Sequence, residues 1–111
     1  MSFSKNTKEY EYNLPKQDFL QVFDILLDNA TKYGDKKIAI ILDQNKITVS
    51  NDGATVEKKD LEKIFDRFYQ IDKSSSGSGL GLAIAKSLAT RNNWELTANS
   101  NGHTTTFMLK Y

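Results

Sequence analysis

The chain has 111 residues, of which 39% are hydrophobic and 26% are charged, as in a one-domain globular protein with an apolar core. Its net charge of +1 argues against a nucleic-acid binder that acts through bulk positive charge. The absence of cysteine excludes disulfides, thiolate metal sites and thiol nucleophiles, and one histidine, His103, cannot form a multi-histidine cluster. No apolar run is long enough to span a membrane and no signal-peptide core is found, so we expect a soluble intracellular domain or an intracellular piece of a larger protein.

The beginning of the chain divides into a leader and a strand. Residues 1–7 are polar and show no periodicity, so we expect a flexible leader over residues 1–8, followed by one domain over residues 9–111. Apolar and polar side chains alternate over residues 9–14, which is typical of a half-buried strand.

A helix and a hairpin are expected next. Pro15 suits the first turn of a helix, and apolar side chains recur at helical spacing over residues 19–33 before Gly34 ends the pattern. Residues 37–42 and 46–50 read as two strands joined by a polar turn, which predicts a hairpin.

The rest of the chain is predicted to hold two helices and two strands. The hairpin should be broken by Asn51-Asp52-Gly53, and Thr55 can cap a helix with Leu61, Ile64, Phe65 and Phe68 on one face. A loop over 72–79, a helix over Leu80–Arg91, a turn at Asn92-Asn93, a strand over 94–98, a turn over 99–103 and a strand over 104–110 complete the order. This order predicts an α/β fold, a two-layer sandwich of a mixed, mostly antiparallel sheet with three helices on one face.

One edge of the first helix carries side chains that suit a nucleotide. At about 100° per residue, Asn29, Lys32 and Tyr33 lie within a fan of roughly 100°. An amide oxygen, a cation and an aromatic ring can serve Mg²⁺, phosphate and a purine. The segment by itself favours the plainer interpretation, a solvated Asn and Lys beside a core Tyr.

Two further segments have the residue types of a nucleotide site. In Ser50-Asn51-Asp52-Gly53, a side-chain oxygen can accept a hydrogen bond from an exocyclic amine, although such a sequence is also a common turn. The run Gly77-Ser78-Gly79-Leu80-Gly81-Leu82 precedes a helix, where free N–H groups and the helix dipole attract anions. It fits neither a dinucleotide fingerprint nor a Walker loop. We favour an anion site over a linker, because Gly81 in the first helical turn costs stability.

In combination, these segments resemble the catalytic and ATP-binding domain of bacterial sensor histidine kinases. Asn29-Ala-x-Lys32-Tyr33, Asn51-Asp52-Gly53, Ile64-Phe-Asp-Arg-Phe-Tyr69 and Gly77-x-Gly-Leu-Gly-Leu-Ala-Ile84 correspond in order to its N box, first glycine box, F box and second glycine box. The resemblance covers Glu9 to Tyr111. It implies the Bergerat-type ATP-binding fold, shared with the ATPase domains of DNA gyrase, a heat-shock chaperone and a mismatch-repair protein.

The resemblance implies ATP and Mg²⁺ as cofactors and assigns a role to each matching residue. Asn29 is the expected Mg²⁺ ligand and Lys32 the expected phosphate contact, both catalytic, and Tyr33 is expected against adenine. Phe65 and Phe68 are expected to anchor a lid. The nucleotide-binding set is completed by Asn51, Asp52, Gly53, Val56, Phe68, Gly77, Gly79, Leu80, Gly81, Leu82 and Thr105.

The chain departs from the family pattern at four positions. Asn51 stands where members usually carry Asp, and a neutral amide accepts a weaker hydrogen bond than a carboxylate does. Thr55 and Thr104 replace glycines. Ile25 stands where the wider superfamily has Glu or Asn, so a polar metal or water partner is missing. Nucleotide binding is therefore better supported by the sequence than catalytic efficiency.

The implied function is to position Mg-ATP for transfer of the γ-phosphate to a histidine on a dimerisation domain absent here. That domain of the same full-length kinase and, indirectly, a response regulator are the expected partners. The expected location is the cytoplasmic side of a membrane-anchored sensor. His103 is interpreted as an ordinary loop histidine. The alternatives are a degenerate nucleotide-binding module without transfer activity and an anti-sigma-type serine kinase.

Overall fold

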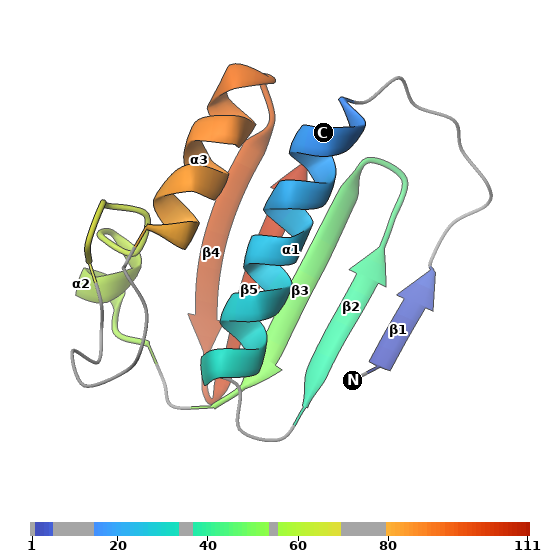
Figure 1. The fold of residues 1–111 in the computed structure, drawn as a ribbon. Coiled ribbons are helices and arrows are strands. Elements are labelled where there is room, and N and C mark those ends of the chain that lie inside the picture. Colours follow the sequence, from blue (N-terminus) through green and yellow to red (C-terminus); the bar gives the residue numbers. More distant parts are fainter. Residues whose placement is uncertain (1, 6–14, 34–36, 54–55, 70–79) are drawn as a thin grey trace.

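The computed structural model describes residues 2–5, 15–33, 37–53, 56–69 and 80–111, without the side chains of residues 2–5, 32 and 33. Five strands and three helices lie in this part of the chain (Figure 1). The strands are β1 (Ser2–Lys5), β2 (Ile38–Leu42), β3 (Lys46–Asp52), β4 (Glu95–Asn101) and β5 (Thr104–Lys110). The helices are α1 (Lys16–Tyr33), α2 (Lys58–Leu61) and α3 (Gly81–Arg91).

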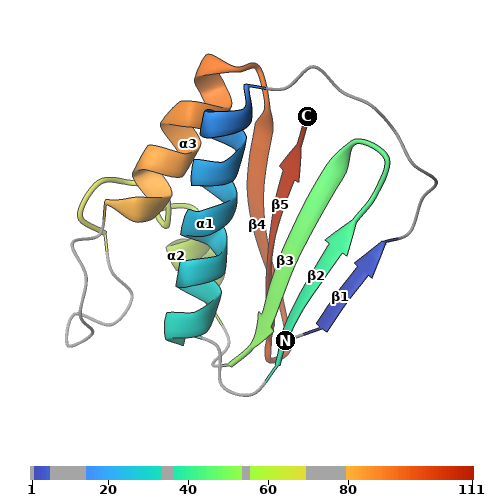
Figure 2. The ribbon, with the colours of Figure 1, turned by 45° about the vertical axis from the view of Figure 1, so that its right-hand side comes forward.

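The strands form one mixed sheet in the order β1-β2-β3-β5-β4. β1 runs parallel to β2, and the other three pairs are antiparallel. The long helices α1 and α3 lie side by side on one face of this sheet, and the short α2 lies beside the outer strand β4 (Figures 1 and 2). The predicted α/β class, with helices covering a mostly antiparallel sheet, is confirmed.

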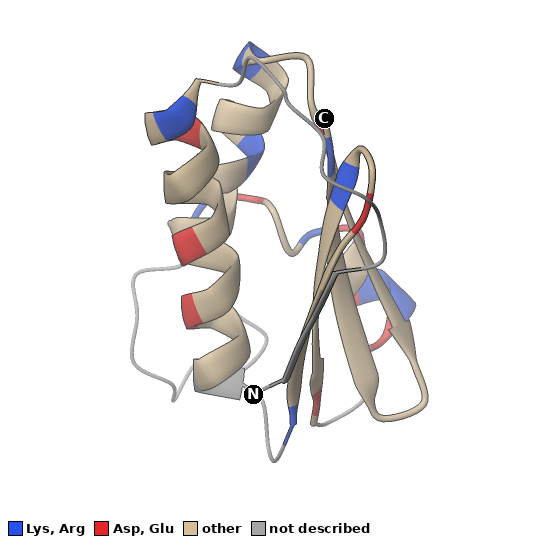
Figure 3. Cartoon of the chain, turned by 90° about the vertical axis from the view of Figure 1, so that its right-hand side faces the viewer, with Lys and Arg blue, Asp and Glu red and all other residues tan. Residues whose placement is uncertain are grey.

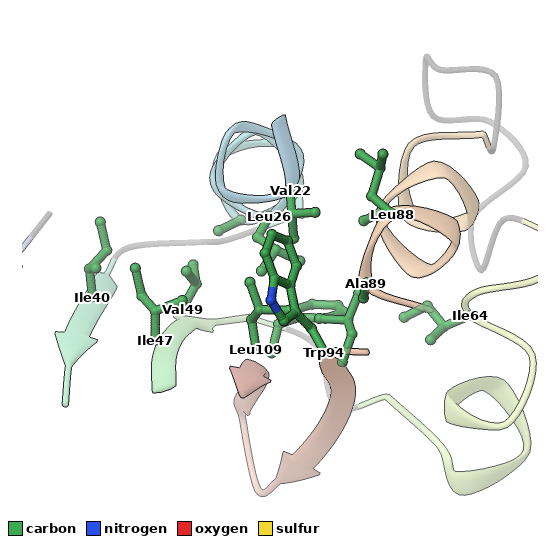
Figure 4. Packing of buried hydrophobic residues seen from close by; sticks show 14 residues of the cluster. Val22, Leu26, Ile40, Ile47, Val49, Ile64, Leu88, Ala89, Trp94 and Leu109 are labelled. Atoms are coloured by element: carbon green, nitrogen blue, oxygen red, sulfur yellow. The ribbon is translucent and has the colours of Figure 1, made fainter. Parts of the chain in front are cut away.

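The core fills the space between the two helices and the sheet. Figure 4 shows Val22 and Leu26 of α1 between that helix and the sheet. Trp94 adds its indole ring next to the end of α3. The buried apolar residues are Val22, Leu26, Ala30, Ile40, Ile47, Val49, Ile64, Ala85, Leu88, Ala89, Trp94, Leu96, Phe107 and Leu109.

Charged side chains stay outside this core. Figure 3 shows acidic positions along α1 on the side that faces away from the sheet. In the described ranges, the buried polar or charged residues are Asn51 and Thr105, and neither of them is ionisable. No helix in the described part of the chain combines the length and the hydropathy that a membrane crossing requires.

The leader prediction is wrong for residues 2–5, which form β1. Its backbone pairs with the edge of β2 from Ser2 opposite Ala39 to Lys5 opposite Leu42. Main-chain N–H and C=O groups make these bonds whatever the side chains are, so a pattern based on side-chain polarity misses them. The strand expected over residues 9–14 lies outside the described residues.

Strand lengths were underestimated where polar residues continue a strand. Asn51 and Asp52 do not break β3 but end it, paired with Thr105 and Thr104 of β5. β4 likewise continues to Asn101, so the turn is confined to Gly102 and His103. Cross-strand bonds along β5 hold these segments extended against their preference for turns.

The helix expected over residues 55–68 is reduced to the single turn of α2. Its N-cap residue Glu57 makes no side-chain capping bond, and Thr55 lies outside the described residues. The apolar residues that suggested a helix are instead held by the core: Ile64 is buried, and Phe65 packs edge-on against Phe107 at 6.2 Å between ring centroids. Tertiary packing therefore overrides the local helical period here.

Two contacts fix the end of the molecule where α1 begins and α3 ends. Arg91 Nη2 lies 2.6 Å from Asp18 Oδ2, and Asn92 Nδ2 donates a 2.8 Å hydrogen bond to the same oxygen. Beside them, the ring of Phe19 packs edge-on against Trp94 and Tyr111. The hydrogen bonds that Arg91 and Asn92 donate to Asp18 lower the pKa of its carboxyl group, and the bond from Arg91 has the larger effect.

Candidate functional site

The candidate site begins where the apolar rows of the sheet become polar. Along β3 the burial alternates, so that Ile47, Val49 and Asn51 face the helices. The row of Val49 continues into Phe107 and Ala98, whereas the row of Asn51 continues into Thr105 and Ser100. Directly paired residues of antiparallel strands share a face. We call Asn51, Thr105 and Ser100 the polar row.

The polar row is closed at its β4 end by the segment after β3. The backbone N–H of Val56 donates a 3.2 Å hydrogen bond to Ser100 Oγ. Val56, half-buried, is thereby held at the same level of the sheet as Asn51. Sequence reasoning missed Ser100 because it reads as part of a polar turn, and the strand alternation from Leu96 is the signal that would have found it.

Asp52 and Gly53 stabilise the strand end from the other side. Asp52 follows Asn51 in the strand and so faces the opposite side of the sheet, where its Oδ1 accepts a 3.0 Å hydrogen bond from Thr104 Oγ1. Gly53 N–H donates to the carbonyl of His103 at 2.7 Å. The exposed His103 lies in the turn between β4 and β5. The structure thus separates Asp52 from the polar row and gives it a structural bond.

The second half of α1 passes over this end of the sheet. Asn29 is half-buried and is followed by the buried Ala30. Lys32 and Tyr33 lie in the last turn of α1, where the structure describes their backbone but not their side chains. In the described residues no three His, Asp or Glu side chains gather to hold a metal. An amide oxygen such as that of Asn29 suits Mg²⁺ when nucleotide phosphates and water supply the other ligands.

The start of α3 lies against the middle of α1. Leu80 occupies the N-cap position and makes no side-chain capping bond, and the first turn carries no acidic residue. The helix therefore presents N–H groups and the positive end of its dipole. Leu82 is half-buried against the core, and a Cβ atom on Gly81 would lie 3.5 Å from Ile25 Cγ2. Gly77 and Gly79 lie outside the described residues.

The F-box residues behave differently from one another. Phe65 is held by Phe107 and by Lys86, whose Nζ lies 5.2 Å from the ring centroid and donates to the Leu96 carbonyl at 2.9 Å. Phe68 is 69% exposed and has a φ of 65°, which is uncommon for a large side chain. Sequence reasoning missed Lys86, because a lysine on a helix normally indicates only a solvated face.

An open hollow of about 500 Å³ adjoins the β4 end of the polar row. It lies between α2 and β4, at the edge of the molecule. Its lining includes Val56 and Ser100 but not Asn29, Asn51 or Thr105. The described structure therefore pairs Asn51 with Thr105 and holds Val56 beside the same row through Ser100, on the face of the sheet that α1 covers, whereas Asp52 faces the other side.

Comparison with known proteins identifies the family of this chain. Residues 15–111 match the family described as histidine kinase-, DNA gyrase B-, and HSP90-like ATPase. The sensor histidine kinase WalK of Bacillus subtilis is 36% identical over 127 aligned residues, which cover 93% of this chain and 21% of that protein. The sensor protein kinase WalK of Staphylococcus saprophyticus is 40% identical over 72% of this chain and 15% of that protein. The chain thus spans about a fifth or less of the length of these curated relatives.

Solved structures show the same fold. The nucleotide-free catalytic domain of histidine kinase ThkA superposes with a TM-score of 0.81 at 23% identity, covering 97% of this chain and 74% of that one. Full-length ShkA in complex with AMPPNP gives a TM-score of 0.82 at 20% identity, covering 97% of this chain and 24% of that one. The match over residues 15–111 and the shared fold lead to one conclusion: the chain belongs to the histidine kinase-, DNA gyrase B-, and HSP90-like ATPase family.

Proposed function

We propose that this chain is the ATP-binding catalytic domain of a sensor histidine kinase. It positions Mg-ATP for transfer of the γ-phosphate to a histidine on a dimerisation domain of the same full-length protein. The observation that carries the proposal is the buried polar pair of Asn51 and Thr105 on the sheet face that α1 covers, in a chain whose relatives are named sensor kinases.

The proposed roles combine the described positions of Asn51, Thr105 and Val56 with the resemblance of the other residues to the family motifs. Asn51 and Thr105 hold the base and Val56 packs on it, while Tyr33 lies against its other side. Asn29 supplies one oxygen to Mg²⁺, and Lys32 with the backbone of Gly77, Gly79 and Gly81 meets the phosphates, flanked by Leu80 and Leu82. Gly53 has no side chain, which lets the flat base approach the backbone at the end of β3. Asp52 acts indirectly, by fixing β3 to Thr104. Phe68 belongs to the lid.

Phosphoryl transfer depends mainly on positioning and on charge stabilisation. The start of α3 and Lys32 supply positive potential where charge develops, and Mg²⁺, when bound, neutralises the phosphate oxygens. The domain proposed for this role spans residues 9–111 together with β1. Its partners are the dimerisation domain and, indirectly, a response regulator, and its place is the cytoplasmic side of a membrane-anchored kinase.

Calorimetry with ATP and ADP, with and without Mg²⁺, tests the binding step. We expect saturable binding that Mg²⁺ strengthens. The absence of saturable binding at about millimolar nucleotide would overturn the proposal. A dissociation constant of about 1 mM corresponds to a binding free energy of only about −4 kcal/mol, which is too weak for a specific nucleotide site.

Labelled ATP and a separately added cognate acceptor domain test the transfer step. We expect slow phosphorylation of the acceptor, because separation removes the high effective concentration that tethering provides. The 111-residue chain by itself should acquire no phosphohistidine at His103. Stable phosphohistidine on the isolated chain, or tight binding without transfer to any acceptor, would contradict the proposed kinase role.

A further inference from the structure

We propose that the base pocket of this chain accepts 6-oxopurine nucleotides as well as adenine nucleotides, because Asn51 and Thr105 can each donate or accept a hydrogen bond. This inference rests on the proposed function and specifies the substrate class of that same site.

Asn51 and Thr105 are polar side chains that lie at the edge of the core without a hydrogen bond that would stabilise the fold. They are 5% and 6% exposed, and in the described part of the chain neither side chain makes a hydrogen bond. The neighbouring rows of the same strands, which carry Val49 and Phe107, are filled with apolar side chains.

The polar atoms of this pair are nevertheless reachable from outside. No described side-chain nitrogen or oxygen atom is both sealed from solvent and unpartnered. The amide of Asn51 and the hydroxyl of Thr105 therefore keep an opening to solvent, although both residues are nine-tenths buried. Two adjacent polar groups that are accessible and unpartnered are suited to hydrogen bonds with the edge of a flat ligand.

The hydrogen-bonding capacity of the pair does not distinguish the two purine classes. An adenine edge offers a donor at its 6-amino group and an acceptor at N1, whereas a 6-oxopurine offers an acceptor at O6 and a donor at N1. An Asn side chain carries an acceptor and donors that exchange places when the amide turns over, and a hydroxyl can act in either sense. Asn51 and Thr105 can thus satisfy either edge.

A carboxylate at position 51 would remove this ability to bind both purine classes. An ionised Asp accepts hydrogen bonds only, so it pairs with the 6-amino group and opposes the 6-oxo group. Sites that hydrogen-bond one analogue reject a mismatched analogue strongly, because buried polar groups are left unpaired. Asn51 is therefore the residue that determines base specificity here.

Competition binding with ATP and inosine triphosphate, on the full 111-residue chain with Mg²⁺, tests the inference. Inosine triphosphate differs from ATP at the 6-position and its N1 proton. We expect the two affinities to lie within about tenfold of each other, as a lost or gained neutral hydrogen bond allows. Inosine triphosphate binding more than about a hundredfold weaker than ATP would overturn the inference while leaving the proposed function intact.

Two variants separate base recognition from folding. Asn51→Asp should strengthen ATP binding and weaken inosine triphosphate binding, each by about tenfold, since a charged hydrogen bond is stronger than a neutral one. Asn45→Asp makes the same charge change in the exposed β2–β3 turn, about 20 Å from Asn51 along β3, and should alter neither affinity.

The remaining outcomes are also decisive. An unchanged ratio of the two affinities in folded Asn51→Asp would refute the role of Asn51. If that variant does not fold, the wild-type ratio alone decides. If the wild-type chain binds neither nucleotide, the proposed function itself fails, and with it this inference.

Discussion

The side chain of Ile25 in the middle of α1 faces the first residue of α3: a Cβ atom added to Gly81 would lie 3.5 Å from Ile25 Cγ2. That distance is an ordinary van der Waals contact, so a methyl group at Gly81 fits without a shift of either helix. Packing therefore does not require glycine there. The start of α3 tolerates a side chain sterically, and the reason for its glycine is to be found in the ligand.

Gly81→Ala is expected to leave folding intact and to weaken nucleotide binding. Alanine in a helix is more favourable than glycine by about 0.5–1 kcal/mol, so the free energy of unfolding should stay equal or rise. The added methyl group would occupy space beside the backbone N–H groups of the first turn of α3, so the nucleotide phosphates could not come as close to them. Urea unfolding and ATP calorimetry measure the two effects.

Gly102→Ala is the control for this variant. Gly102 has a φ of 62° in the β4–β5 turn, and an added Cβ atom would meet nothing within 4 Å, so alanine should cost about 1–2 kcal/mol of stability through its backbone conformation alone. Its ATP affinity should not change. If Gly81→Ala lost stability but kept its ATP affinity, glycine at position 81 would be required for packing and not for nucleotide binding.

Ile25→Asn is expected to raise the rate of phosphate transfer to an added acceptor domain. The substitution places an amide at the contact between α1 and the start of α3, one helical turn before Asn29. There it can orient a water molecule or the metal. Single-turnover transfer with labelled ATP measures the rate. Ile25→Val, which keeps the site apolar, should leave it unchanged, and equal rates in all three chains would contradict the idea.

Asn29→Ala is expected to weaken Mg²⁺-dependent nucleotide binding more than Asp28→Ala does. Asn29 is half-buried on the side of α1 near the site, whereas Asp28 is exposed. Removing a metal ligand should cost about tenfold or more in affinity, and only when Mg²⁺ is present. Calorimetry with and without the metal tests this. Equal losses in the two folded variants would mean that Asn29 is not the ligand.

Leu26→Ala is expected to destabilise the domain by about 2–5 kcal/mol, since it leaves a cavity under α1. Leu26 is fully buried, whereas Leu20 on the same helix is 46% exposed. Leu20→Ala should therefore change the free energy of unfolding by less than about 0.5 kcal/mol. Urea unfolding of both variants provides the comparison, and a small loss in Leu26→Ala would contradict the described core.

The bond between Asp18 and Arg91 is expected to stabilise the fold at neutral pH and to lose its effect in acid. Hydrogen bonds from Arg91 and Asn92 lower the pKa of Asp18 from its ordinary value of 3.8. The unfolded state then takes up a proton first as the pH falls, so the stabilisation is complete above pH 3.8 and declines below it.

Unfolding of Asp18→Asn at neutral pH and near pH 3 tests this dependence. The difference in unfolding free energy between wild type and Asp18→Asn should shrink as the pH falls. Asp24→Asn, an exposed change on the same helix, is the control. A difference that grows in acid would contradict the described contact.

The sequence predicted those parts of the fold where side-chain period and burial agree. α1, the β2–β3 hairpin, α3 and β5 follow apolar patterns that the core reproduces. The failures have one cause, which is that backbone pairing and tertiary contacts are invisible in a local pattern. β1 is polar yet pairs with β2, and the residues around Ile64 look helical yet are held in turns by the core.

The candidate site was predicted in part for the same reason. Asn51 was found from its motif, but its separation from Asp52 follows only from the strand alternation of β3. Ser100 was missed because its role depends on being two strands away from Asn51 in the sheet. Residue types therefore indicated the chemistry, and the register was needed to show which of them lie together.

The hydrogen bond from Lys86 to Leu96 has a consequence for the behaviour of the chain at high concentration. β4 is the last strand of the sheet; Val56 and α2 lie beside it near Ala98–Ser100, whereas the first residues of β4 have main-chain groups on the outer side that another strand can pair with. Lys86 occupies one of these carbonyls and places a positive charge beside the open side of β4. Two molecules that approach through this strand would bring two such charges together. The lysine therefore opposes edge-to-edge aggregation through β4.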